Sequence, residues 1–146
     1  MSGEILNNFI FVTPTQMKKY VRWCIQHKKS FFIHGSPGVA KSYCLDALCA
    51  EDGLIFTDER LSQFESVDLR GLLDLDKEAG TSKWLPPDQF PKQGDPPGLW
   101  FLDEFSDADM SVKKAAYQLV HDRRIGNYQL PDNWAVGAAG NMLSDL

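Results

Sequence analysis

The feature that most constrains this chain is a short turn that joins an apolar segment to a segment with helical periodicity. The apolar segment covers 30–33, and the turn that follows reads Gly35-Ser36-Pro37-Gly38-Val39-Ala40-Lys41-Ser42. These residues match the pattern G-x-x-x-x-G-K-[ST], except that Ala40 replaces the second glycine. A strand, a turn of this pattern and a helix in this order predict a phosphate-binding loop.

The expected chemistry of the loop follows from its residue types. Glycines let the backbone turn tightly, so that the amides of residues 38–41 can point inward at phosphate oxygens. The positive end of the following helix adds to this attraction, while Lys41 would reach the β- and γ-phosphates and the Ser42 hydroxyl would bind Mg²⁺. We therefore expect the nucleotide to be bound by Gly35, Ser36, Pro37, Gly38, Val39, Ala40, Lys41 and Ser42.

Ala40 is the departure from the usual loop. If its position needs a positive φ, the methyl group costs about 1 kcal/mol, which weakens the loop without abolishing it. The alternative interpretation is a glycine–proline turn that precedes a lysine and a serine without binding phosphate.

An apolar strand that ends in two acids forms the second candidate site. Leu99 to Leu102 are apolar, and Asp103 and Glu104 follow directly. Ligands of open parallel sheets bind at the carboxyl edge, where such acids would lie. We expect Asp103 to hold Mg²⁺, directly or through water, and Glu104 to polarise an attacking water.

The third candidate is Asn141, which comes just after the apolar segment 134–139. A polar side chain there would lie beside the γ-phosphate and the water, a catalytic position. Without the other two sites, an ordinary turn asparagine would be the preferred interpretation.

Strand-like and helix-like segments alternate along the chain. Apolar runs predict strands at 30–33, 54–57, 98–103 and 134–139. Helical spacing predicts helices that begin near Pro14, Ser42 and Leu61, and one more that Asp107 or Asp109 caps. Polar residues 74–83 indicate a surface excursion or hairpin. Five of the eight prolines fall in 85–97, which is typical of a loop, and 125–128 predicts a tight hairpin. The alternation indicates one α/β domain over 1–146, a P-loop NTPase-type three-layer sandwich with a mostly parallel sheet.

Composition narrows the function classes. The net charge is −5 and no long basic run occurs, which argues against indiscriminate binding of nucleic acid. The three cysteines are an odd number and fall in helix-like apolar runs, which argues against a disulfide framework. No apolar stretch is long enough to span a membrane, and no secretory signal is evident. We therefore expect a cytoplasmic protein without a membrane partner.

The three sites, in this order, resemble those of the AAA+ ATPases. Gly35 to Ser42 is similar to their Walker A motif, Leu99 to Glu104 to Walker B, and Asn141 to sensor 1. The part from Arg60 to Asn141 resembles the MoxR-like group more narrowly, and alanine at the Ala40 position occurs in that group. The residues that carry this narrower likeness are Asp68-Leu69-Arg70-Gly71, Phe101-Leu102-Asp103-Glu104-Phe105, Ala116-Tyr117-Gln118-Leu119, Asp122-Arg123-Arg124, Trp134-Ala135-Val136 and Ala139-Gly140-Asn141.

The resemblance implies an ATPase that uses ATP and Mg²⁺, with Lys41, Glu104 and Asn141 catalytic and Ser42 and Asp103 at the metal. It also implies a ring-forming homo-oligomer that remodels partner proteins, with Asp74 to Lys83 as the helix-2 insert. Arg123 and Arg124 have two interpretations: they face a neighbouring subunit, or they lie on the surface at a helix end, where they favour its dipole.

An AAA+ module continues past sensor 1 to an arginine finger and a helical lid, which this sequence lacks. We therefore expect a core truncated after the sensor 1 strand, with nucleotide binding and slow or undetectable hydrolysis by this chain alone. The alternative function is a catalytically weak P-loop module that acts as a nucleotide-dependent interaction domain. A third class, a DNA-directed loader, is disfavoured by the acidic balance.

Overall fold

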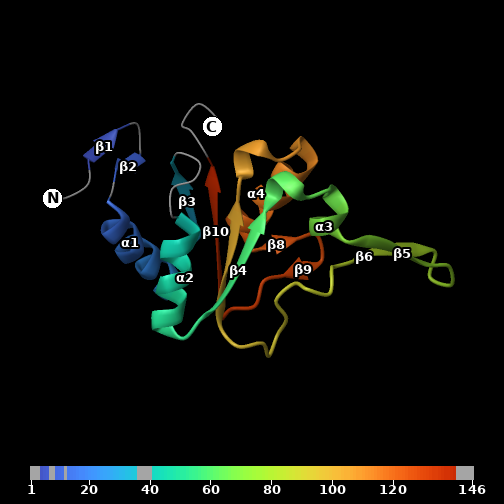
Figure 1. The fold of residues 1–146 in the computed structure, drawn as a ribbon. Helices are drawn as coiled ribbons and strands as arrows, with labels where there is room; N and C mark the ends of the chain where they lie inside the picture. Colours follow the sequence, from blue (N-terminus) through green and yellow to red (C-terminus); the bar gives the residue numbers. More distant parts are fainter. Residues whose placement is uncertain (1–3, 7–8, 12, 36–40, 141–146) are drawn as a thin grey trace.

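The computed structural model describes residues 4–6, 9–11, 13–35 and 41–140, with side chains from residue 13 onward. Its centre is a four-stranded sheet in the order β3 (Phe31–His34), β10 (Trp134–Gly140), β7 (Gly98–Asp103) and β4 (Ile55–Arg60). Every neighbouring pair in this sheet is parallel. The predicted α/β class with a mostly parallel sheet is confirmed, and all four carboxyl ends lie at one edge (Figure 1).

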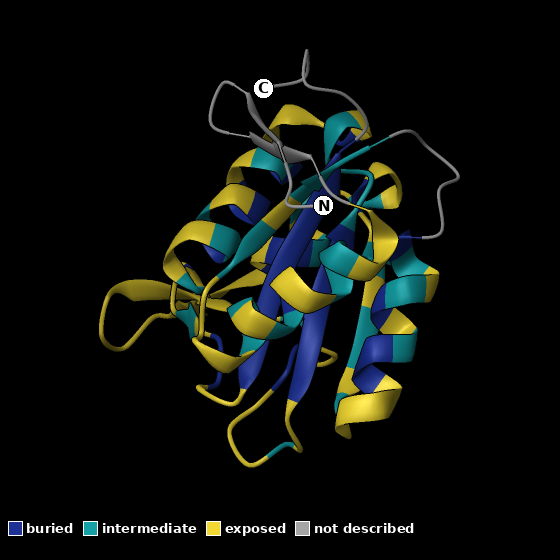
Figure 2. Ribbon diagram, turned by 90° about the vertical axis from the view of Figure 1, so that its left-hand side faces the viewer, coloured by how far each residue is buried: buried dark blue, intermediate teal, exposed yellow. Residues whose placement is uncertain are grey.

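Helices cover both faces of this sheet. Figure 1 shows α1 (Pro14–Gln26) and α2 (Lys41–Asp52) on one side, and α3 (Ser66–Arg70) and α4 (Met110–Asp122) on the other. Successive side chains of β7 alternate between two cores: Leu99 and Phe101 pack with α1 and α2, while Trp100 and Leu102 pack with α4. A strand buried on both faces explains the continuous apolar run in the sequence. Figure 2 shows the buried residues concentrated in these central strands.

The helix ends follow from local chemistry. Thr13 and Gln16 form a reciprocal capping box at the start of α1, with Pro14 as its first residue. After α2, Gly53 adopts a φ of 70°, which ends the helix and lets the chain enter β4. Asp109, one of the two residues that the sequence offered for this cap, lies at the N-cap of α4, and its side chain makes no capping hydrogen bond.

Aromatic contacts hold the proline-rich loop against the sheet. The Phe90 ring lies 4.7 Å from Trp100 and 4.9 Å from Tyr128, measured between ring centroids. The Tyr128 hydroxyl donates a hydrogen bond of 2.7 Å to the Pro91 carbonyl. Tyr128 belongs to the small hairpin of β8 (Arg124–Ile125) and β9 (Tyr128–Gln129), which the sequence predicted.

Two more hairpins lie outside the central sheet: β1 (Glu4–Leu6) with β2 (Phe9–Phe11), and β5 (Leu72–Asp76) with β6 (Thr81–Leu85). The β5–β6 hairpin projects from the body of the molecule, and all residues of its two strands are exposed (Figure 1). Two 3₁₀ turns complete the described chain, η1 (Leu61–Gln63) and η2 (Phe105–Asp107). Among the described residues, no helix is both long and apolar enough to cross a membrane.

Gly71 lies at the base of the β5–β6 hairpin, where the chain leaves no room for a side chain, and a substitution there tests the packing of this base. It has a φ of 79°, and a Cβ at this position would lie 1.8 Å from the Leu85 carbonyl oxygen. We expect Gly71→Ala to lower the free energy of unfolding by at least about 2 kcal/mol, because strain and a backbone clash add up. The matched control is Gly80→Ala at the hairpin tip, where φ is 67° and nothing lies within 4 Å; its cost should be only about 1 kcal/mol. Equal costs in urea titrations would contradict this account.

Candidate functional site

The described ends of the predicted loop and the predicted acids meet at the carboxyl edge of the sheet. Gly35, which opens the loop, donates a backbone hydrogen bond of 3.2 Å to the carbonyl of Gly140 at the end of β10. Asp103 ends the adjacent strand β7. Residues 36–40 and Asn141, which the sequence also assigned to the site, lie outside the described residues. The strand order therefore brings together the described part of the predicted site.

Lys41 is the only buried charged residue in the described part of the chain, with 6% of its surface exposed. It begins α2, and its Nζ lies 4.0 Å from the point where a Cβ on Gly35 would be, so the side chain folds back over the start of the loop. We find no hydrogen bond or ion pair to Lys41 from the other described residues. Burying an unpaired ammonium is costly, so this position favours an anion beside it.

Ser42 and Asp103 lie together one step along the edge. The Ser42 hydroxyl donates to Asp103 Oδ2 over 3.4 Å, and the Glu104 amide donates to Asp103 Oδ1 over 2.8 Å. Hydroxyl and carboxylate oxygens are the hard ligands that Mg²⁺ prefers, and this ion is usually held by one or two protein groups, phosphates and water. The pair therefore fits Mg²⁺, although the described residues contain no group of three or more acids, histidines or cysteines arranged for a metal.

Glu104 is held in an unusual backbone conformation. It adopts the left-handed region, with φ 55° and ψ 39°, between the end of β7 and η2. The Ser62 hydroxyl of η1 donates a hydrogen bond to Glu104 Oε2. Strained residues of this kind are frequent at functional sites, because the surrounding structure must fix them in place. The sequence indicated Glu104 but gave no sign of its partner Ser62.

Asp58 is a residue of this site that the sequence reasoning missed. It pairs in register with Phe101, so it shares the sheet face of Phe101, Asp103 and α2. Burial raises the pKa of the Asp58 carboxyl, the charges of Asp103 and Glu104 add to the rise, and a hydrogen bond with Ser42 opposes it. The sequence did carry a signal, an acid directly after an apolar run, but the strand was predicted to stop at Thr57 and β4 continues to Arg60.

Arg123 has a structural role that neither sequence interpretation described. Its guanidinium donates to the carbonyls of Pro131 and Trp134 over 2.9 and 2.7 Å, and burial lowers its pKa. It therefore ties the end of α4 to the segment before β10 and to the first residue of that strand, rather than lying free on the surface. Arg124 is exposed.

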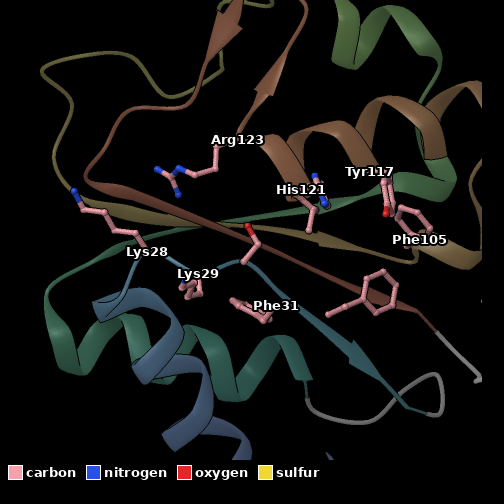
Figure 3. A pocket seen from close by; sticks show the side chains of 10 residues that line it. Lys28, Lys29, Phe31, Phe105, Tyr117, His121 and Arg123 are labelled. Carbon is pink, nitrogen blue, oxygen red and sulfur yellow. The ribbon is translucent and has the colours of Figure 1, made fainter. Parts of the chain in front are cut away.

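A separate hollow of about 480 Å³ lies at the outer edge of β3, between the α1–β3 connection and α4 (Figure 3). It is lined by Lys28, Lys29, Ser30, Phe31, Phe32, Phe105, Tyr117, Val120, His121 and Arg123. None of the sequence-predicted site residues lines it. The hollow is thus distinct from the edge that carries Lys41 and Asp103.

Comparison with known proteins supports the fold. No family model and no curated protein matches the sequence. Among solved structures, a candidate ATPase from Cytophaga hutchinsonii is similar with a TM-score of 0.63 and 18% identity, over 90% of this chain and 40% of that one. A RuvB mutant from Thermotoga maritima is similar with a TM-score of 0.56 and 13% identity, over 99% of this chain and 44% of that one. NtrX from Brucella abortus is similar with a TM-score of 0.55 and 13% identity, over 92% of this chain and 32% of that one.

These similarities show that the chain has the α/β fold of P-loop ATPases. The chain spans less than half the length of each of these structures. One further similar structure is NtrX in complex with ADP, at a TM-score of 0.52 and 12% identity.

Lys41, which has no partner among the residues that the structure describes, leads to a prediction about the ligand-free protein. We expect Lys41→Met to raise the free energy of unfolding by about 1 kcal/mol or more, because an apolar side chain of similar length removes a buried charge. Exposed Lys114 supplies the control, and Lys114→Met should change stability by less than about 0.5 kcal/mol. Urea titration without phosphate or nucleotide measures both values, and a destabilised Lys41→Met protein would argue against an unpaired charge.

Proposed function

We propose that this chain is the ATP-binding core of an ATPase that hydrolyses ATP with Mg²⁺. The observation that carries the proposal is Lys41, a buried cation without a partner among the described residues, next to the Ser42–Asp103 pair at the carboxyl edge. A buried cation favours an anion, and the neighbouring oxygens favour a hard cation. A Mg-nucleotide supplies both in one molecule.

The described residues have separate roles in this proposal. Lys41 binds the β- and γ-phosphate oxygens, together with the backbone amides of residues 38–41. Ser42 and Asp103 would hold Mg²⁺, which neutralises charge on the phosphates when it is bound. Asp103 also accepts a hydrogen bond from the Glu104 amide, which fixes the Asp103 carboxylate at the end of its strand.

Glu104 orients the attacking water in this proposal and accepts its proton. The hydrogen bond from Ser62 gives this carboxylate a defined position. Asn141 follows Gly140, whose carbonyl accepts a hydrogen bond from the amide of Gly35, the first loop residue. This position in the sequence supports a role for Asn141 beside the γ-phosphate.

The finer assignment is an AAA+ protein of the MoxR-like group that remodels protein partners and assembles as a ring. The projecting β5–β6 hairpin supports a protein partner. Leu73 and Trp84 are paired across it, 50% and 43% exposed, and Leu75 on the same face is 63% exposed. Isolated two-stranded hairpins are only marginally stable in water, so a covering partner would stabilise this one. The acidic net charge disfavours a DNA partner.

Calorimetric titration of Mg-ATP tests the nucleotide site directly. We expect micromolar binding by the wild-type chain and no measurable binding by Lys41→Ala, because the ammonium makes the central phosphate contact. Lys114→Met serves as the control for the loss of a positive charge elsewhere. A folded wild-type protein that produces no heat with Mg-ATP would contradict the proposed function.

Hydrolysis should depend on Glu104 separately from binding. We expect the ATP turnover rate of Glu104→Gln to be at least about 100-fold lower than that of the wild type, which is typical for removal of a general base. The affinity for Mg-ATP should stay within about threefold of the wild type. A phosphate-release assay with matched calorimetry measures both, and equal turnover in the two proteins would exclude this role for Glu104.

A further inference from the structure

The outer edge of β3 is open in the described part of the chain. β3 is the last strand of the central sheet, and β10 is its only neighbour among the described strands. Gly35 donates its amide to the Gly140 carbonyl, so every second residue of β3 faces β10. By this alternation Phe32 turns its amide and carbonyl to the outer side. An edge of this kind is a template for pairing with a further strand.

The hollow of about 480 Å³ lies at this same edge, and its lining defines what suits it. Phe32 and Phe105 form part of an aromatic wall, with their rings edge to face and their centroids 5.3 Å apart. Lys28, Lys29 and Arg123 supply cations, and no acid of the described chain lines the hollow. Figure 3 shows Lys28 and Arg123 towards one end and Phe105 towards the other. An extended segment with acidic and apolar side chains matches both the open edge and this lining.

The strand β5 of the projecting hairpin is such a segment. It reads Leu72-Leu73-Asp74-Leu75-Asp76, is exposed throughout, and carries two acids and no base. Lys83 of β6, opposite Asp74, is the one base in the two strands of the hairpin. β5 pairs with β6 alone in the described chain, so its other edge is open as well. A two-stranded hairpin is marginally stable in water, and further strands stabilise it.

The hairpin lies too far from the hollow of its own molecule to fill it. β3 and β4 are the two outer strands of the sheet, and the hairpin leaves the body on the side of β4 (Figure 1). A contact between the hairpin and the hollow therefore joins two copies of the chain. Contacts of this type, between two different surfaces, repeat head to tail.

We propose that the open edge of β5 docks in the hollow of a second copy, where it extends the sheet at β3 and brings Asp74 and Asp76 to the cations of the lining. This inference rests on the proposed function for the assembly alone, to which it assigns the two contacting surfaces. Neither surface contains a residue assigned to the nucleotide or the metal.

Charge reversal on either surface should weaken the contact. We expect Lys28→Glu/Lys29→Glu and Asp74→Lys/Asp76→Lys each to self-associate at least about 10-fold more weakly than the wild type, because like charges then meet. An equimolar mixture of the two should recover association to within about threefold of the wild type, because the intact hollow of one variant accepts the intact hairpin of the other.

A matched control reverses two charges elsewhere. Lys19 and Lys92 are exposed and do not line the hollow, so Lys19→Glu/Lys92→Glu should associate within about twofold of the wild type. Thermal unfolding verifies the fold of every variant. Lys29→Glu and Asp76→Lys as single substitutions replace a double variant that does not fold.

Sedimentation equilibrium at low salt measures association, and hydrogen exchange locates the contact. We expect the amides of 31–34 and 72–76 to gain protection as the protein concentration rises. A wild type that stays monomeric at its highest soluble concentration overturns the inference. Undiminished association of the reversed variants, no recovery in their mixture, or protection confined to other segments also overturns it.

Calorimetry with Mg-ATP keeps this inference apart from the nucleotide proposal. Both reversed variants should bind Mg-ATP within about twofold of the wild type, because the substitutions lie away from the nucleotide site. A wild type that associates as described but binds no Mg-ATP overturns the proposed function and supports the contact. A wild type that binds Mg-ATP but does not associate overturns the contact alone.

Discussion

The site geometry depends on the close packing of β10 between β3 and β7. A Cβ on Gly137 would lie 2.2 Å from the Phe31 ring, and one on Gly140 would lie 2.6 Å from the Ser106 hydroxyl. The absence of side chains at these two positions lets Phe31 of β3 lie over β10 and lets η2 approach its end. Because β10 separates the loop strand from the acid strand, this packing sets the spacing between Lys41 and Asp103.

Charge at the carboxyl edge is arranged at a cost to the ligand-free fold. Lys41 is buried without a described partner, while the negative charges of Asp103 and Glu104 add to the burial that raises the pKa of Asp58. Both features oppose folding, since an unpaired buried charge and neighbouring like charges are each unfavourable. A ligand that carries anionic phosphates and a divalent cation relieves both at once. Local conflicts of this kind are expected where a sequence is adapted to binding rather than to stability.

The sequence predicted the framework better than the side-chain network. The apolar run before Asp103 predicted β7 within its observed bounds. Asp58 was missed because strand propensity fades at charged residues, although β4 continues to Arg60 through pairing with β7. The Ser62–Glu104 bond is a contact between segments far apart in the chain, which no local pattern encodes. The roles of Lys41, Ser42, Asp103 and Glu104 stay predictions, although the fold brings these residues to one edge.

One continuous part of the chain carries Asp58 and Ser62 and leads to the projecting hairpin. Asp58 lies in β4, Ser62 lies in η1 directly after this strand, and α3 then leads through Gly71 into the projecting hairpin. Leu61 and Leu69 are fully buried in the core beneath α4, so η1 and α3 are fixed by packing rather than by the hairpin. Ser62, which contacts Glu104, and the hairpin with its exposed apolar surface are therefore joined through the same two short elements, η1 and α3. If a partner bound at Leu75 and displaced the hairpin, the displacement would reach Glu104 through the packed elements α3 and η1.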